Sequence, residues 1–85
     1  MFDVQFGTGK VLIPLRIEAA TWFDARAYGA QWLGVDTMNV LCRPSQPGYR
    51  ADLSLEWRGD DYSGSRRLWT RTRDKGGRWR KWVLA

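Results

Sequence analysis

The chain predicts a small α+β domain in which one α-helix packs on an antiparallel sheet of about four to five strands. Apolar and polar residues alternate in several short segments, as in half-buried strands. One segment instead has the spacing and the caps of a helix. The 85 residues contain no linker that would divide them, so we expect one domain over 1–85. The expected order is strand–(strand)–helix–strand–strand–strand–strand.

Residues 11–19 (VLIPLRIEA) predict a strand, because apolar side chains recur at every second position. Pro14 cannot donate a ladder hydrogen bond, so we expect it at a sheet edge or a bulge. Val4 and Phe6 can begin the same hairpin, with residues 7–10 (GTGK) as its turn. These residues lack the full spacing of a phosphate-binding loop, so we interpret them as a turn only.

Residues 21–33 predict the helix. Thr21 suits the N-cap position, and Asp24 follows three residues later, as in a capping box with Asp in place of Glu. Gly34 stands just after the helix, where a left-handed residue often ends one. The apolar face of this helix consists of Trp22, Ala25, Gly29 and Leu33.

Further strands are expected at 38–43, 49–58, 66–73 and 78–84. Alternation is cleanest in 49–58, which indicates one buried and one solvent-facing side. The predicted buried side consists of Tyr49, Ala51, Leu53, Leu55 and Trp57. Residues 59–65 read as a loop, and the Asp-Lys-Gly-Gly sequence at 74–77 predicts a hairpin turn between the last two strands.

One cysteine and no histidine limit the chemistry of the chain. Cys42 has no partner for an internal disulfide, which favours a reducing, intracellular setting; a dimer through Cys42 is the less favoured alternative. Histidine-based catalysis and Cys/His zinc sites are excluded. The start of the chain lacks a signal-peptide pattern, and no apolar run approaches the roughly 20 residues of a membrane span. We therefore expect a cytoplasmic protein that is not an enzyme, needs no cofactor or metal and binds no membrane.

Positive charge is concentrated in residues 66–85, which carry eight Arg or Lys and one acid, whereas residues 1–65 carry six basic and eight acidic residues. The same segment holds three of the six Trp. Basic side chains bind phosphates, and interleaved aromatics stack on unpaired bases. Arg predominates, which favours two-pronged contacts to phosphate or guanine. The candidate nucleic-acid-binding residues are Arg66, Arg67, Trp69, Arg71, Arg73, Lys75, Arg78, Trp79, Arg80 and Lys81.

The faces of this hairpin are only partly determined by alternation. On 66–73, one face carries Arg67, Trp69, Arg71 and Arg73. On 78–84, Trp79 falls on the face opposite Trp82. A register slip of one residue exchanges the faces, so which Trp are buried stays open. We expect Trp57 and at least one hairpin Trp in the core, with a basic face outside. The alternative is a solvated face on which guanidinium groups cover the Trp rings.

Residues 17–42 resemble the N-terminal module of the Jag family of bacterial RNA-binding proteins. The shared pieces are a helix start at Ala20-Thr21, the pair Asp24-Ala25, the ending AQWLGV at 30–35 and a strand with Val40. The resemblance implies a helix packed on a sheet. This helix carries aromatics where that family has Glu and Lys, and the family's later RNA-binding modules, a KH domain among them, are not in this sequence. No binding residues are therefore transferred.

Residues 66–84 are similar to the basic, Trp-bearing hairpins of phage-integrase arm-binding domains, which lay a small sheet against DNA. The residues that match in type are Trp69, Arg71, Arg73, Lys75, Gly76 and Arg78. The integrase catalytic residues and the helix that follows such hairpins are not in this sequence. The resemblance implies a hairpin that contacts DNA and no catalysis.

Together these patterns predict a small nucleic-acid-binding protein, of a kind that phages and other mobile elements encode, which contacts the phosphates of DNA or RNA through the C-terminal hairpin. Binding should depend steeply on salt and should be lost when Arg71, Arg73, Arg78 and Arg80 become Ala. The alternative is a protein-interaction or assembly module, such as a phage structural or inhibitor protein. Its partner or second copy would dock on a sheet edge and on the aromatic helix face of Trp22, Phe23, Tyr28 and Trp32.

Overall fold

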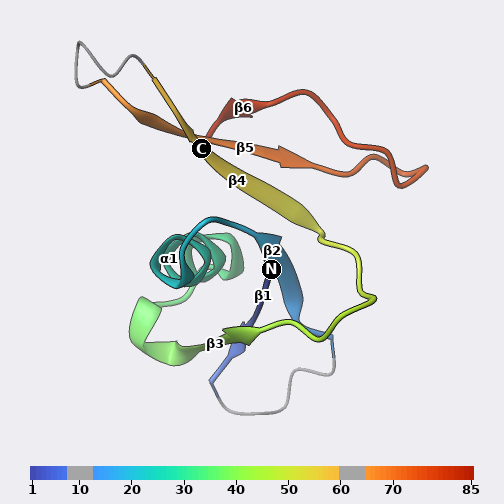
Figure 1. The fold of residues 1–85 in the computed structure, drawn as a ribbon. Helices are drawn as coiled ribbons and strands as arrows, with labels where there is room; N and C mark the ends of the chain where they lie inside the picture. The colour runs from blue at the N-terminus through green and yellow to red at the C-terminus, as the bar shows by residue number, and fades with distance from the viewer. Residues whose placement is uncertain (8–12, 60–64) are drawn as a thin grey trace.

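The computed structural model describes residues 1–7, 13–59 and 65–85, and its fold is the α+β arrangement that the sequence predicts (Figure 1). A mixed sheet has the strand order β3-β1-β2-β4-β5-β6. The strands are β1 (Phe2–Phe6), β2 (Leu15–Glu18), β3 (Val40–Pro44), β4 (Leu53–Arg58), β5 (Arg67–Thr72) and β6 (Val83–Leu84). The helix is α1 (Trp22–Leu33), and a 3-10 turn, η1 (Thr37–Asn39), leads into β3.

The sheet differs from the predicted one in strand number and in direction. Within the described residues it has 6 strands, against the predicted four to five. It is also not purely antiparallel, because β2 and β4 run parallel, with Ile17 opposite Leu53. The parallel pair follows from the path of the chain. After β2, the chain passes through α1 and pairs β3 with β1, so β4 must return from the far side to reach the free edge of β2.

β2 is an interior strand and is shorter than the predicted segment 11–19. Pro14 lies directly before it, so the prediction of a sheet edge or bulge for Pro14 is wrong. The ladder with β1 runs from Leu15 opposite Val4, and a proline outside the ladder leaves no N–H missing from it. Residues 8–12, which include most of the predicted turn at 7–10, and residues 60–64 of the predicted loop lie outside the described residues.

Helix α1 begins at the predicted cap. The Thr21 hydroxyl accepts a hydrogen bond from the Asp24 N–H at 3.2 Å. The Asp24 carboxylate serves a different purpose from the expected capping box, because its Oδ2 accepts from the indole N–H of Trp57 at 2.8 Å. This bond joins the start of the helix to β4.

Helix α1 ends in the predicted Schellman motif. Gly34 has φ 70° in the left-handed region and donates to the Gln31 carbonyl, while Val35 donates to the Ala30 carbonyl. Glycine is favoured here because it adopts this conformation without a Cβ clash.

The core lies where α1 packs against β1, β2 and β3. Small residues on the helix allow a close approach: a Cβ added at Gly29 would lie 2.5 Å from Val4 Cγ1. The buried core residues are Val4, Ile17, Ala25, Ala30, Val40, Leu53 and Leu55. No helix in the described part of the chain is both long enough and apolar enough to cross a membrane.

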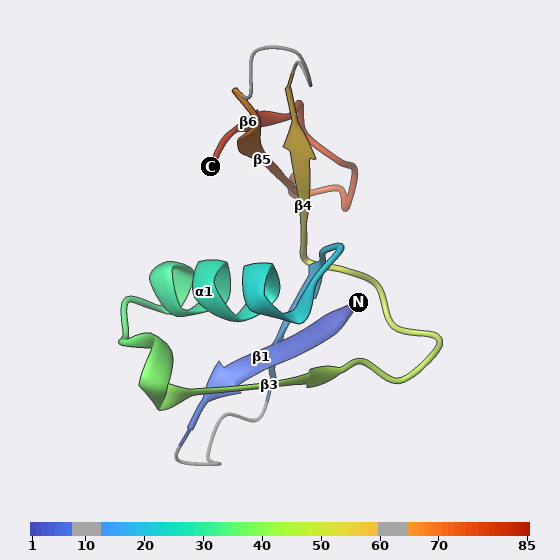
Figure 2. The same ribbon diagram turned by 60° about the vertical axis from the view of Figure 1, so that its left-hand side comes forward.

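Helix α1 covers only part of the sheet, because β4, β5 and β6 extend away from it (Figure 2). Trp57, which we expected in the core, lies toward the far end of β4 and is 43% exposed. We call the sheet face toward α1 the helix side and the opposite face the outer face. Because directly paired residues point to the same side of a sheet, the register places Arg58, Arg67, Trp69 and Arg71 on the outer face.

Candidate functional site

The basic segment folds as the predicted hairpin. The Gly77 N–H donates to the Asp74 carbonyl at 3.0 Å, and the Asp74 carboxylate accepts from the N–H groups of Gly76 and Arg78. Asp74, the one acidic residue in the basic segment 66–85, therefore stabilises the turn.

A β-bulge interrupts the return strand of the hairpin, by which we mean residues 78–84. The Arg80 N–H donates to the Thr72 carbonyl at 2.8 Å, and Val83 pairs with Thr70. Between these two contacts β5 has one residue, Arg71, whereas the return strand has two, Lys81 and Trp82. The extra residue shifts the alternation by one position. Trp82 therefore lies on the same face as Trp79, and the prediction of opposite faces is wrong.

Guanidinium groups and indole rings alternate on the outer face. The guanidinium carbon of Arg71 lies 4.4 Å from the ring centroid of Trp79 and 4.5 Å from that of Trp82. Arg73 lies 3.9 Å from the Trp79 centroid, and Arg58 lies 4.5 Å from that of Trp82. We call these five residues the Arg/Trp stack. The expectation of a Trp-bearing core face opposite a basic face is thus wrong: one face carries both, since α1 does not reach this part of the sheet.

Arg73 also fastens the hairpin turn to the segment before β4. Its Nε donates to the Ala51 carbonyl at 2.7 Å, and a second guanidinium nitrogen donates to the Gly77 carbonyl at 2.9 Å. Arg50 donates to the same Gly77 carbonyl at 2.7 Å. Replacing Arg73 would weaken the fold as well as remove a charge. A loss of binding in the variant with Ala at positions 71, 73, 78 and 80 would therefore not separate lost contacts from lost folding.

Other predicted contact residues keep their charges exposed, and within the described residues their side chains make no hydrogen bond or ion pair. They are Arg66, Arg67, Lys75, Arg78, Arg80 and Lys81. The register separates them: Arg67 lies on the outer face, whereas Arg80, which pairs with Thr72, points to the other side. The structure therefore surrounds the hairpin with cations rather than gathering all predicted residues on one face.

Trp69 lies on the outer face apart from the Arg/Trp stack and is half-buried. It lines a shallow hollow of about 260 Å³ together with Arg58, Gly59, Ser65 and Arg67. Arg58 and Arg67 stand directly opposite each other in the register. Like charges in directly opposed positions destabilise a sheet, so this pair favours the presence of an anion.

Arg58 and Arg50 are site residues that sequence reasoning missed. Both fall on the solvent-facing side of the predicted strand 49–58, which was not connected to the hairpin. Arg58 also pairs with Glu56 at 3.1 Å. The signal that could have identified Arg58 is the strand register, because pairing β4 with β5 places it opposite Arg67.

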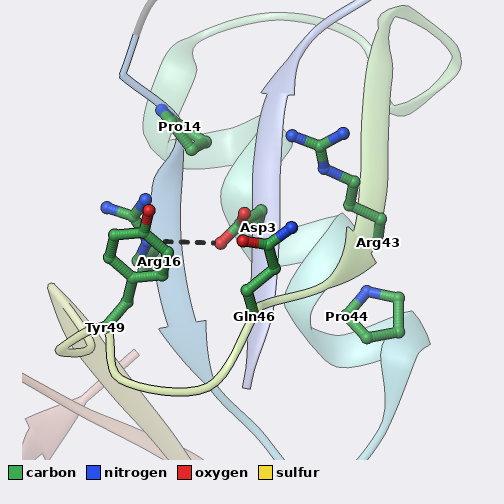
Figure 3. A pocket seen from close by; sticks show the side chains of 7 residues that line it. All are labelled: Asp3, Pro14, Arg16, Arg43, Pro44, Gln46 and Tyr49. Atoms are coloured by element: carbon green, nitrogen blue, oxygen red, sulfur yellow. Dashed lines mark ion pairs between the residues drawn. The ribbon is translucent and has the colours of Figure 1, made fainter.

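A second hollow of the outer face lies in the helix-covered half (Figure 3). Its volume is about 320 Å³. Arg16 Nε lies 3.5 Å from Asp3 Oδ1, and its guanidinium carbon lies 3.9 Å from the Tyr49 ring centroid. Asp3 also accepts a hydrogen bond from Ser45. Because Asp3 offsets the charge of Arg16, this hollow has less unpaired positive charge than the hairpin, although exposed Arg43 lines it.

Cys42 is half-buried on the helix side of β3. Burial raises the pKa of its thiol; the charge of Arg26 opposes this shift and that of Asp3 adds to it. In the residues that the structure describes, no three His, Cys, Asp or Glu side chains gather as they would around a metal ion.

No protein-family model, curated protein or solved structure matches this chain. The resemblances to the Jag module and to integrase hairpins therefore stay predictions, and the function is inferred from the residues themselves.

Proposed function

We propose that this protein binds nucleic acid through the outer face of β4, β5 and the return strand of the hairpin. The Arg/Trp stack is the observation that carries the proposal. Arg58, Arg71 and Arg73 lie against the rings of Trp79 and Trp82, on a face that the helix does not cover. Guanidinium groups positioned in this way lose less conformational entropy when they bind phosphate.

The charge around the stack supports the same proposal. The outer-face cations Arg67, Arg71 and Arg73 have no acidic partner within the described residues, and Asp74 accepts hydrogen bonds within the turn. An anionic polymer bound along this surface would release its counterions, which favours binding at low salt. The type of nucleic acid, DNA or RNA, is part of the test below.

A gel-shift titration over a salt series tests the proposal with duplex DNA, single-stranded DNA and RNA. The logarithm of the binding constant should fall linearly with the logarithm of salt concentration, by about 0.7–0.9 per phosphate neutralised. The variant R67Q, which removes an exposed cation from the outer face, should lower this slope by about 0.7–0.9. Wild-type protein that binds none of the three polymers at low salt would contradict the proposal.

The Arg67 side chain is exposed and makes no hydrogen bond, ion pair or ring contact within the described residues. Substitutions at such surface positions usually change stability by less than about 0.5 kcal/mol, which a thermal melt can verify. R80Q is the matched control for R67Q, since each removes one exposed Arg from the hairpin and Arg80 points to the other side of the sheet. R80Q should leave the salt slope unchanged, whereas R67Q should lower it.

A second candidate function is a protein-interaction or assembly module. It is favoured by large apolar side chains exposed on successive elements: Trp32 on α1, Met38 on η1 and Leu41 on β3. β3 is also an edge strand that could pair with another chain. Light scattering separates the candidates, because a stable oligomer without affinity for any nucleic acid favours this one.

A further inference from the structure

We infer that the ligand of the outer face is single-stranded nucleic acid, with an unpaired base stacked on Trp69 and the neighbouring phosphate held by Arg58 and Arg67. This inference rests on the proposed function and adds the class of ligand and the residue that reads it.

Trp69 differs from the other Trp residues of the hairpin in what its ring contacts. The rings of Trp79 and Trp82 each lie against two guanidinium groups. Trp69 has no such contact with a cation or another ring in the described part of the chain. Its ring is half-buried and lines the hollow, so the part that faces the hollow is accessible to a ligand, while the other two Trp rings lie against the arginines.

The hollow at Trp69 suits a flat group with an attached anion. Its volume of about 260 Å³ is below the range of roughly 300–1,000 Å³ that drug-sized ligands occupy, and it is shallow. A ring stacked on Trp69 would leave its phosphate near the rim, between the opposed cations Arg58 and Arg67. Glu56 offsets Arg58 only in part, since that ion pair is exposed to solvent.

Duplex DNA fits this face less well. In a duplex the faces of the bases are already stacked on one another and cannot reach Trp69. The major groove is about 12 Å wide and admits a two-stranded ribbon. Here β5 is flanked on both sides, by β4 and β6, so the strand axes alone span about 10 Å before side chains are added. At the turn, Arg50 and Ala51 add a third segment beside the ribbon.

Fluorescence anisotropy with labelled oligonucleotides tests the inference. The probes are a mixed-sequence strand, its duplex and an abasic strand with the same number of phosphates. Each is about 12 nucleotides long, within the roughly 4–16 nucleotides that such surfaces cover, and DNA and RNA strands are both used. The unaltered protein should bind the base-bearing strand at least about tenfold more tightly than the duplex or the abasic strand.

Trp69→Ala should weaken binding to the base-bearing strand by about 5- to 150-fold and leave binding to the abasic strand unchanged. Trp69→Phe keeps an aromatic face and should retain most of the affinity. Trp32→Ala is the matched control, because it removes an exposed Trp from α1, and it should change neither. The salt slope separates the roles: Arg67→Gln should lower it by about 0.7, and Trp69→Ala should not lower it.

Equal affinity for the strand, the duplex and the abasic strand would overturn the inference and leave the proposed function standing, provided that Arg67→Gln still weakens binding. Failure to bind any probe at low salt would remove both. Because the abasic comparison uses the unaltered protein, the inference stays testable even if Trp69→Ala does not fold.

Discussion

The half of the sheet beneath α1 and the half formed by β4, β5 and β6 are stabilised by different kinds of interaction. Beneath the helix, Val4 and Ile17 are fully buried against small helical residues. In the other half, the buried residues lie at the end of β4 nearest the helix and directly beside it on β5. They are Leu53, Ser54, Leu55 and Thr70, whereas Val83 and Leu84 are about half exposed. There, guanidinium–indole contacts and hydrogen bonds from Arg50 and Arg73 supplement the strand ladder.

The arginines of the hairpin accordingly form two groups. Arg73 makes contacts that hold the hairpin together, whereas Arg67, Arg78 and Arg80 are exposed and have no such contacts within the described residues. A surface stabilised by its own cations can remain open to an anionic ligand, since no apolar layer has to cover it. Tests of binding therefore belong on Arg67, the member of the second group on the outer face, and tests of folding on Arg73.

The largest expected effect comes from breaking the helix-covered half. Ile17→Ala should lower the free energy of unfolding by about 2–5 kcal/mol, because it removes buried methyl groups and leaves a cavity. Urea denaturation measures the change. Ile13→Ala is the matched control: Ile13 is 78% exposed, so the same truncation should cost less than about 0.5 kcal/mol. Equal losses in the two variants would contradict the placement of the core.

A smaller effect is expected from the hairpin half. Arg73→Ala removes two charge-assisted hydrogen bonds and one ring contact, and it should lower the free energy of unfolding by about 2–3 kcal/mol. In this variant, amide hydrogen exchange should accelerate relative to wild type, and the increase should be larger in β5 than in β1. Arg80→Ala removes the same charge without those bonds and should stay within about 0.5 kcal/mol of wild type. If both variants behave alike, the distinction between holding and exposed arginines is wrong.

The smallest effect concerns the Cys42 thiol at the edge of the helix-covered half. Burial raises its pKa in the folded state, so the neutral thiol is favoured by folding. This contribution is complete below the unfolded pKa of about 8.5 and is lost as pH rises through the higher folded value. Unfolding measured from pH 7 to 10 should therefore show a steeper loss of stability in wild type than in Cys42→Ala. A thiol reagent at pH 8 should also label the native protein more slowly than the unfolded one.

Much of the helix could be predicted because its signals are local. Thr21 and Gly34 act through hydrogen bonds that span only a few residues, and both caps are present as expected. Helical spacing also implies that at least one aromatic of this helix is exposed, since aromatics on several sides of one helix cannot all be buried, but only the structure shows that Phe23 and Trp32 are the most exposed of them. The hairpin turn at 74–77 belongs to the same group, because Asp74 and the glycines act within the turn itself.

The predictions that are wrong concern residues whose surroundings come from distant parts of the chain. Alternation marks Trp57 as inward-facing, which is correct, but it cannot show that Trp57 lies at the rim of the helix-covered half, where its indole N–H bonds to Asp24 and the side chain stays 43% exposed. Pro14 could not be placed without knowing that β2 lies inside the sheet. The bulge opposite Arg71 sets the sheet face on which Trp82 lies, and no pattern of residues in the sequence indicates that bulge.

Local patterns in the chain are enough to predict the class of fold, the helix and its caps, the alternation of the strands and the concentration of cations in residues 66–85. Each of these depends on neighbours in the chain. Contacts between distant segments set the rest: β2 and β4 pair in parallel, α1 leaves half of the sheet uncovered, and Arg71 lies against both Trp79 and Trp82. The reason is physical: strand order, register and bulges are set by pairing between distant segments, and a shift of one residue moves each side chain to the other face.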